Sequence, residues 1–215
     1  MNIKDDSRKI KVGDIFVSLG NNPNHVLAAI EKGAKKVIVN SGDYNVETIV
    51  VPNTKEYLIN YLKNNYYDKI KNLKLIGITG TNGKTTTAYL IWQALNKLGR
   101  KCAYIGTLGF YVEDKIKDLS NTTPDICELY EMLLKCEEES CEYVVMEVSS
   151  HALDLKRVAS LYFDYSIFTN LTEDHLDYHK TMENYCLAKQ RLFEMLKENG
   201  KGLINVDDKY YRCFI

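Results

Sequence analysis

A glycine-rich segment between a short apolar run and a helical pattern is the part of this sequence best suited to chemistry. It consists of Gly80-Thr81-Asn82-Gly83-Lys84-Thr85-Thr86. Backbone N–H groups at the start of a helix attract anions, and glycine lets the backbone approach phosphate oxygens closely. Lys84 can neutralise phosphate charge, and Thr85 can ligate Mg²⁺. We therefore predict a loop that binds the phosphates of ATP together with magnesium.

The match to the general phosphate-binding loop is incomplete. In the pattern G-x-x-x-x-G-K-[ST] the first glycine would stand at position 78, where this sequence has Ile78, and the additional glycine is Gly80. The predicted order of strand, loop and helix supports phosphate binding. The alternative is a glycine-rich turn between strand and helix with an incidental lysine.

An acidic residue, Glu147, stands near the end of the apolar run 143–148. Enzymes with a phosphate-binding loop need an acidic magnesium ligand at the end of a neighbouring strand. A carboxylate in so apolar a run is costly to bury unless it is paired or bound to metal. We expect Glu147 to be a metal ligand. The alternative is a cap for the following helix, which Ser149 or Ser150 would supply equally well.

Three polar clusters also follow predicted strands. They are Asn121-Thr122-Thr123-Pro124, Ser149-Ser150-His151 and the segment from Thr169 to Asp177. The carboxyl ends of strands form the edge where ligands bind in open α/β sheets. Asn, Thr and Ser suit a polar substrate, and His175 suits a second cation. Each cluster alone is typical of a turn or helix cap, but together they indicate a site.

The elements that must position these residues alternate between strand and helix. Strands are predicted at 14–19, 36–39, 49–51, 75–79, 102–106, 143–148, 165–169 and 202–206, with a hairpin at 110–112 and 115–116. Helices are predicted at 25–32, 55–71, 84–98, 125–138 and 182–197. This order predicts an α/β fold with a mostly parallel sheet flanked by helices. We expect a small N-terminal β/α domain with its linker at 1–72 and a central domain at 73–215.

The composition excludes several classes of partner and compartment. With 28 Lys and Arg against 29 Asp and Glu, the net charge of −1 provides no field for nucleic acid. No apolar run has the roughly 18 residues that a membrane span needs, and residues 1–11 lack the apolar region of a signal peptide. The six cysteines form no C-x-x-C pair, which favours reduced thiols and a cytoplasmic protein.

These motifs resemble those of the Mur ligases, the ATP-dependent enzymes that add amino acids to UDP-N-acetylmuramoyl intermediates of peptidoglycan. The loop from Gly80 to Thr86 has the form found in that family. Further segments resemble the members that extend UDP-MurNAc-L-Ala-D-Glu, and the resemblance extends from Asp6 to Asp208. These segments are Asp6-Ser7-Arg8, Asn121-Thr122-Thr123-Pro124, Met146-Glu147-Val148-Ser149-Ser150-His151-Ala152-Leu153, Asp174-His175-Leu176-Asp177-Tyr178-His179 and Ala188-Lys189.

The resemblance implies a role for each site residue. Lys84 and Thr85 would hold the ATP phosphates and the first Mg²⁺, with Glu147 as its ligand, and His175 would ligate a second Mg²⁺. Lys189 matches a lysine that CO₂ carbamylates in the family, although the local pattern alone indicates an exposed helix lysine. Ser7 would bind the uridine end of the substrate. The muramoyl-dipeptide would be bound by Asn121, Thr122, Thr123, Ser149 and Arg157.

The implied reaction is phosphoryl transfer from ATP to the D-Glu side-chain carboxylate of UDP-MurNAc-L-Ala-D-Glu. The resulting acyl phosphate would be attacked by the amine of L-Lys or meso-diaminopimelate. Lys84, His175 and Lys189 would be the catalytic residues.

The sequence also departs from the family pattern. Family members are longer, so we expect an incomplete central domain, no C-terminal amino-acid-binding domain and no tripeptide synthesis by this chain alone. The segment 20–25 lacks the usual Asp-Gly turn, and Leu155 replaces a polar substrate contact. The sheet edge near Val206 would need a missing C-terminal half or another covering partner.

Two alternatives to a ligase of muramoyl-dipeptide stay open. One is a non-catalytic nucleotide-binding remnant or half of a split ligase. The other is a folylpolyglutamate-type or cyanophycin-type ligase on the same scaffold. The segments Asp6-Ser7-Arg8 and Asn121-Thr122-Thr123-Pro124 favour the muramoyl substrate over the second alternative.

Overall fold

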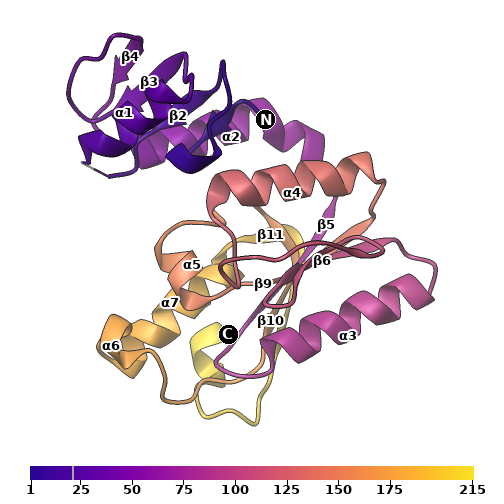
Figure 1. Cartoon of the computed structure of the whole chain (residues 1–215). Helices are drawn as coiled ribbons and strands as arrows, with labels where there is room; N and C mark the ends of the chain where they lie inside the picture. Colours follow the sequence, from indigo (N-terminus) through magenta and orange to yellow (C-terminus); the bar gives the residue numbers. More distant parts are fainter. Residues whose placement is uncertain (21) are drawn as a thin grey trace. The chain divides into compact units, whose positions relative to one another are not determined.

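The computed structural model describes residues 1–20 and 22–215, so Asn21, in the segment 20–25 singled out above, lies outside the described residues. The chain forms two compact units, Met1–Asn65 and Tyr66–Ile215, and the helix α2 (Thr54–Ile70) runs through the boundary (Figure 1). Among the described residues, no helix has the length and apolar character needed to cross a membrane.

The first unit contains a four-stranded parallel sheet in the order β1-β2-β3-β4. Its strands are β1 (Ile3–Lys4), β2 (Ile15–Val17), β3 (Lys36–Val39) and β4 (Glu47–Val50). The helix α1 (Pro23–Glu31) begins after Asn22, whose side chain accepts a hydrogen bond from the Asn24 N–H. Its buried Val26 and Ala29 pack with Phe16 and Val37 of the sheet. The short helix η1 (Ser7–Lys9) precedes β2.

The second unit contains a seven-stranded sheet in the order β11-β10-β5-β9-β6-β7-β8. The strands are β5 (Lys74–Thr79), β6 (Cys102–Gly106), β7 (Gly109–Tyr111), β8 (Lys115–Lys117), β9 (Tyr143–Glu147), β10 (Phe163–Phe168) and β11 (Leu196–Ile204). Strands β6, β9, β5, β10 and β11 are parallel, and β7 and β8 form an antiparallel hairpin at one edge. The α/β class and the mostly parallel sheet predicted from the sequence are confirmed.

The helices of this unit are α3 (Lys84–Lys97), α4 (Ile126–Glu138), α5 (Ser150–Asp154), α6 (Leu176–His179), α7 (Met182–Glu194) and the short η2 (Tyr211–Phe214). Helices lie on both faces of the sheet (Figure 1), and α5, α6 and η2 contact α7. Ala88 of α3 packs with Ile76 and Ile78 of β5. Gly77, between these two isoleucines, instead faces Leu192 of α7. Alternation along β5 therefore places α3 and α7 on opposite faces of the sheet.

Three features differ from the sequence-based expectation. The predicted helix 182–197 ends at Glu194, and β11 starts at Leu196 with an irregular register opposite residues 163–165, earlier than the predicted start at 202. The cluster 121–124 follows the antiparallel strand β8, so it does not leave the carboxyl end of a parallel strand. The elements β1, η1, α5, α6 and η2 are too short to give a periodic pattern, and none was predicted.

Gly77 provides a direct test of the packing between β5 and α7. A Cβ atom at this position would lie 2.9 Å from side-chain atoms of both Leu192 and Phe163, which are fully buried. We expect Gly77→Ala to lower the free energy of unfolding by about 1–3 kcal/mol, because the core must shift to admit the methyl group. Urea unfolding measures this change. Gly20→Ala is the control, since its Cβ would meet nothing within 4 Å, and equal effects of the two substitutions would refute this packing.

Candidate active site

The glycine-rich loop connects β5 to α3, as predicted, and its backbone requires glycine at two positions. Gly80 has φ 146° and Gly83 has φ 83°, both in the region that L side chains rarely adopt. A Cβ atom on Gly80 would overlap Thr169 Oγ1. Gly83 is the N-cap residue of α3, so the loop leads directly into the positive end of that helix. The loop thus combines a close backbone approach with a helix N-terminus, which is the arrangement that suits a polyphosphate.

The segment after β10 holds this loop in place. Thr169 Oγ1 donates to Asn82 O at 2.7 Å, and the Asn170 amide bonds both the N–H and the carbonyl of Asn82 at 3.0 Å. The Thr81 N–H donates to Asn170 O at 2.8 Å. Thr169 and Asn170 belong to a cluster that the sequence assigned to substrate binding. In the structure they instead hydrogen-bond to the glycine-rich loop and hold its conformation.

Two lysine side chains converge on one carbonyl of the loop. Lys84, the first residue of α3, donates from Nζ to Gly80 O and to Thr81 O, both at 2.9 Å. Lys189 of α7 donates from Nζ to the same Gly80 O at 2.9 Å. Burial lowers the pKa of Lys84, and the Glu147 carboxylate partly offsets this effect. One amine from the helix on each face of the sheet thus hydrogen-bonds to the same loop carbonyl.

The expectation that Lys189 is an exposed helix lysine is wrong. Its exposed fraction is 1%, and its Nζ lies 4.3 Å from the centre of the Tyr185 ring. Burial, together with the nearby charge of Lys84, lowers the pKa of Lys189 to about 7. The amine is therefore partly neutral near pH 7 and able to act as a nucleophile. Packing of α7 over β5 and β10 buries it, which no local pattern reveals.

Glu147 ends β9 on the α3 side of the loop and is fully buried. Its carboxylate accepts hydrogen bonds from Thr85 Oγ1 at 2.8 Å, Tyr104 Oη at 2.6 Å and the Thr107 N–H at 2.8 Å. Burial, followed by the bond to Glu147, raises the pKa of the Tyr104 hydroxyl. Thr85 and Glu147 thus meet at the start of α3, as a shared Mg²⁺ site requires. The residues Tyr104 and Thr107 carried no motif and were missed in the sequence.

The alternative role for Glu147, a helix cap, belongs instead to Ser149. The Ser149 side chain accepts from the Ala152 N–H at the start of α5. Ser149 also ties this turn to the buried Thr123, whose Oγ1 accepts from the Ser149 N–H at 3.0 Å and donates to Glu147 O at 3.0 Å. Arg157 donates to Thr123 O at 3.1 Å and pairs with Asp125 at 2.9 Å. Thr122 Oγ1 lies 3.2 Å from Oγ1 of Thr107, another hydrogen-bonding partner of Glu147. With Asn121, the residue before Thr122, five of the six predicted substrate residues therefore belong to this region.

His175 lies in a second cluster of rings. It is the N-cap residue of α6, in the left-handed region with φ 52°, and its ring centre is 4.9 Å from that of His151. Burial lowers the pKa of both His151 and His179. Within residues 1–20 and 22–215, no group of three or more His, Cys, Asp or Glu side chains is arranged to hold a metal ion. Of the three predicted metal ligands, Thr85 and Glu147 are hydrogen-bonded to each other. Metal binding by His175 stays a prediction.

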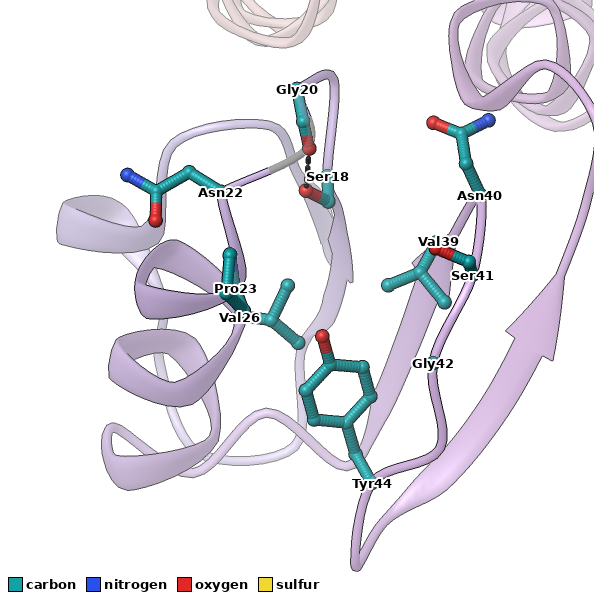
Figure 2. Close-up of a pocket in the computed structure, with 10 residues that line it drawn as sticks. All are labelled: Ser18, Gly20, Asn22, Pro23, Val26, Val39, Asn40, Ser41, Gly42 and Tyr44. Carbon is teal, nitrogen blue, oxygen red and sulfur yellow. Dashed lines mark hydrogen bonds between the residues drawn. The ribbon is translucent and has the colours of Figure 1, made fainter.

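The remaining predicted substrate residue, Ser7, lies in η1 of the first unit. The Asp6 side chain caps this turn, and hydrogen bonding from Arg8 lowers the pKa of Asp6. The same unit has a cavity of about 220 Å³ at the carboxyl ends of β2 and β3. Figure 2 shows Ser18, Asn40 and Tyr44 among the residues around it. This polar and aromatic lining suits a small heterocyclic ligand.

The lowered pKa of Lys189 predicts a pH dependence of stability. Between the folded pKa of about 7 and the ordinary value of 10.5, the unfolded chain binds a proton that the folded chain does not. Stability therefore rises with pH in this window, by up to about 1.4 kcal/mol per pH unit. Lys189→Met lacks this contribution. We expect its unfolding midpoint, measured in CO₂-free buffer, to lie above that of the wild-type chain most clearly near pH 7 and least near pH 9, whereas a constant difference would contradict the lowered pKa.

Comparison with known proteins agrees with this geometry. Residues 78–215 match the family described as Mur ligase middle domain. A UDP-N-acetylmuramoyl-L-alanyl-D-glutamate--2,6-diaminopimelate ligase of Fusobacterium nucleatum is 43% identical over 216 residues, which cover 97% of this chain and 44% of the relative. The ligase of the same description from Clostridium perfringens is 44% identical over 217 residues, with the same coverage.

Solved structures of Mur ligases are also similar to this chain. A UDP-N-acetylmuramoyl-L-alanyl-D-glutamate--2,6-diaminopimelate ligase superimposes with a TM-score of 0.83 at 30% identity, over 99% of this chain and 44% of that protein. MurF from Acinetobacter baumannii has a TM-score of 0.67 at 22% identity, which shows a shared fold alone, over 99% of this chain and 46% of MurF. The chain thus spans about 44% of the length of the curated relatives it matches. It belongs to the Mur ligase family.

Proposed function

We propose that this chain forms the ATP-binding and UDP-sugar-binding part of a ligase that adds 2,6-diaminopimelate to UDP-MurNAc-L-Ala-D-Glu. The observation that carries the proposal is the loop at Gly80, where Lys84 faces the loop carbonyls and Thr85 meets the buried Glu147. The relatives named above are 2,6-diaminopimelate ligases, which favours diaminopimelate over L-Lys, the two amino acids that the sequence left open. The relatives are more than twice as long, so the complete reaction is a proposal for the whole protein.

The residues present suit ATP with Mg²⁺. The backbone from Gly80 to Gly83, and the side chains of Lys84 and Thr86 at the start of α3, would bind the phosphates. Thr85 and Glu147 would hold the cation, with His175 proposed for a second one. Bound MgATP supplies the phosphoryl group that activates the substrate carboxylate. The chain contributes orientation and charge compensation in a partly buried site, where such interactions are strong.

Lys189 is proposed to carry a carbamate formed from CO₂. A lysine amine must be neutral to react in this way, and burial of Lys189 lowers its pKa to about 7. The product is an anion beside the loop carbonyl of Gly80, where the unmodified side chain places its amine. The modification would replace one of two neighbouring cationic groups by a negative charge, which favours the ammonium of Lys84.

We propose one site on each unit for the two ends of the UDP-MurNAc-dipeptide, the dipeptide end on the second unit and the uridine end on the first. Thr123, Ser149 and Arg157 form one hydrogen-bonded group beside Glu147, with Asn121 and Thr122 before it in the chain. Ser7 and the cavity of the first unit (Figure 2) are proposed for the uridine end. We assign residues 1–72 to the UDP-sugar-binding domain with its linker and 73–215 to the ATP-binding domain.

The α3 face of the sheet has an apolar groove of about 250 Å³ that polypeptide outside residues 1–215 is proposed to cover. It lies beside α3 over β5, β10 and β11 and is lined by Ile76, Ile91, Leu95, Tyr143, Tyr165, Ile167 and Leu203. Leu203 on the edge strand is 48% exposed. The relatives contain more than 200 further residues by length, since this chain spans 44% of them. A helix or strand formed by those residues would cover the apolar groove and pair with the exposed edge strand β11.

Lys84→Met tests nucleotide binding. Loss of charge-assisted hydrogen bonds to phosphate costs about 1.5–3 kcal/mol, or roughly a ten- to hundred-fold loss of affinity. We expect this loss in titrations with a fluorescent ATP analogue in the presence of Mg²⁺. Lys97→Met, at the opposite end of α3, is the control and keeps wild-type affinity. Equal affinity of the wild-type chain and both variants would contradict a role of this loop in nucleotide binding.

Arg157→Met tests the substrate part of the proposal. Arg157 is held by Asp125 and Thr123, so its guanidinium is oriented before substrate binds. We expect affinity for UDP-MurNAc-L-Ala-D-Glu, measured by calorimetry, to fall by about ten-fold or more. Arg191→Met removes a comparable pair with Asp154 and leaves this affinity unchanged. The assignment fails if Arg157→Met binds the substrate as tightly as the wild-type chain.

A further inference from the structure

Thr79, the last residue of β5, carries a buried hydroxyl that lacks a partner. Its exposed fraction is 0%. Of the buried side-chain nitrogen and oxygen atoms in residues 1–20 and 22–215, its Oγ1 alone has no hydrogen bond. Burying a hydroxyl without a hydrogen bond is unfavourable, and such groups are rare in folded proteins. An unpartnered hydroxyl next to Gly80 therefore requires an explanation.

Alternation along β5 shows which way this hydroxyl points. Ile76 and Ile78 pack with Ala88 of α3. Gly77 faces the other side, since a Cβ atom there would lie 2.9 Å from Leu192 of α7. Thr79 is two residues beyond Gly77 in the same strand and so projects from the same face. The Thr79 side chain thus faces α7.

Three contacts give the register of α7 over this face. Leu192 lies opposite Gly77, Lys189 Nζ donates to Gly80 O at 2.9 Å, and Tyr185 Oη is 3.3 Å from Thr81 Oγ1. The helix therefore runs antiparallel to β5, and its residues 185, 189 and 192 form one stripe along the strand and loop. Thr79 lies between the levels of Leu192 and Tyr185, which is the level of Lys189.

The neighbours of Thr79 within the sheet are apolar. Phe168 of β10 is its Cα partner, and Val148 follows the β9 residue paired with Ile78. Phe168 and Val148 are both almost completely buried. Side chains at paired positions project to the same face, so these two flank the hydroxyl. Lys189 is the polar side chain that α7 places at this level.

We propose that Thr79 is a positioning residue that donates a hydrogen bond from Oγ1 to a carbamate on Lys189. This inference rests on the carbamylation of Lys189 proposed above. The neutral Nζ forms a bond to the carbon of CO₂, one C=O electron pair moves to oxygen, and the amine releases one proton to solvent. The product extends the side chain beyond Nζ and ends in two oxygens that share one negative charge and can only accept hydrogen bonds. A buried anion needs donors, and Thr79 supplies one.

Thr79→Val tests this role because it removes the hydroxyl and keeps the shape of the side chain. Carbamate is measured by NMR with ¹³C-bicarbonate as the probe, titrated at fixed pH, and Lys189→Met identifies the signal. We expect Thr79→Val to need about ten-fold more CO₂ than the wild-type chain for half occupancy. Thr79→Ser keeps the hydroxyl and is expected to restore occupancy close to the wild-type level.

Stability provides a second readout. Thr79→Val removes an unpaired buried hydroxyl, so in CO₂-free buffer we expect its thermal midpoint to be at least as high as that of the wild-type chain. Because a bound group stabilises the folded state, bicarbonate should raise the wild-type midpoint more than that of Thr79→Val. A purely structural role for Thr79 would give the same difference in both buffers.

The outcomes separate the two proposals. If the wild-type chain gives no carbamate signal that Lys189→Met abolishes, carbamylation itself is wrong and the role of Thr79 falls with it. If the wild-type signal is present and Thr79→Val titrates at the same CO₂ concentration, carbamylation stands and Thr79 is not its hydrogen-bond donor.

Discussion

The carbonyl oxygen of Gly80 is the point on which the arrangement of this site depends. Lys84 reaches it from α3 on one face of the sheet, and Lys189 reaches it from α7 on the other, each at 2.9 Å. Residue 80 must be glycine, because its φ of 146° and its close approach to Thr169 leave no room for a side chain. The loop therefore links α3 and α7, which lie on opposite faces of the sheet, through one peptide group.

Electrostatics separates the roles of the two amines. Lys189 is the more deeply buried, and burial with the charge of Lys84 lowers its pKa to about 7. Burial also lowers the pKa of Lys84, but the charge of the nearby Glu147 carboxylate partly offsets this effect. The nearby Glu147 carboxylate thus favours the charged form of Lys84, whereas burial favours the neutral form of Lys189 that the proposed carbamylation needs. Two neighbouring lysines with the same environment would have no such difference.

The sequence predicted the features that depend on short-range pattern. The loop, its helix and the position of Glu147 at the end of β9 follow from residues close in the chain, and these placements agree with the structure. The burial of Lys189 was not predicted, because it depends on the stripe of α7 that covers β5. Thr169 and Asn170 were expected to face substrate but hold the loop, since their partner Asn82 is nearly 90 residues away in the chain. Tyr104 and Thr107 likewise donate hydrogen bonds to Glu147 only because β6 pairs with β9.

The most direct test is to locate the cation in crystals of the chain grown with Mn²⁺ and a non-hydrolysable ATP analogue. Anomalous scattering identifies Mn²⁺, which occupies Mg²⁺ sites through the same oxygen ligands. The account predicts a peak in contact with Thr85 Oγ1 and linked to the Glu147 carboxylate, with the analogue's phosphates on the backbone of residues 80–85. A peak remote from both side chains, with the 2.8 Å hydrogen bond between Thr85 and Glu147 intact and the phosphates elsewhere, would contradict it.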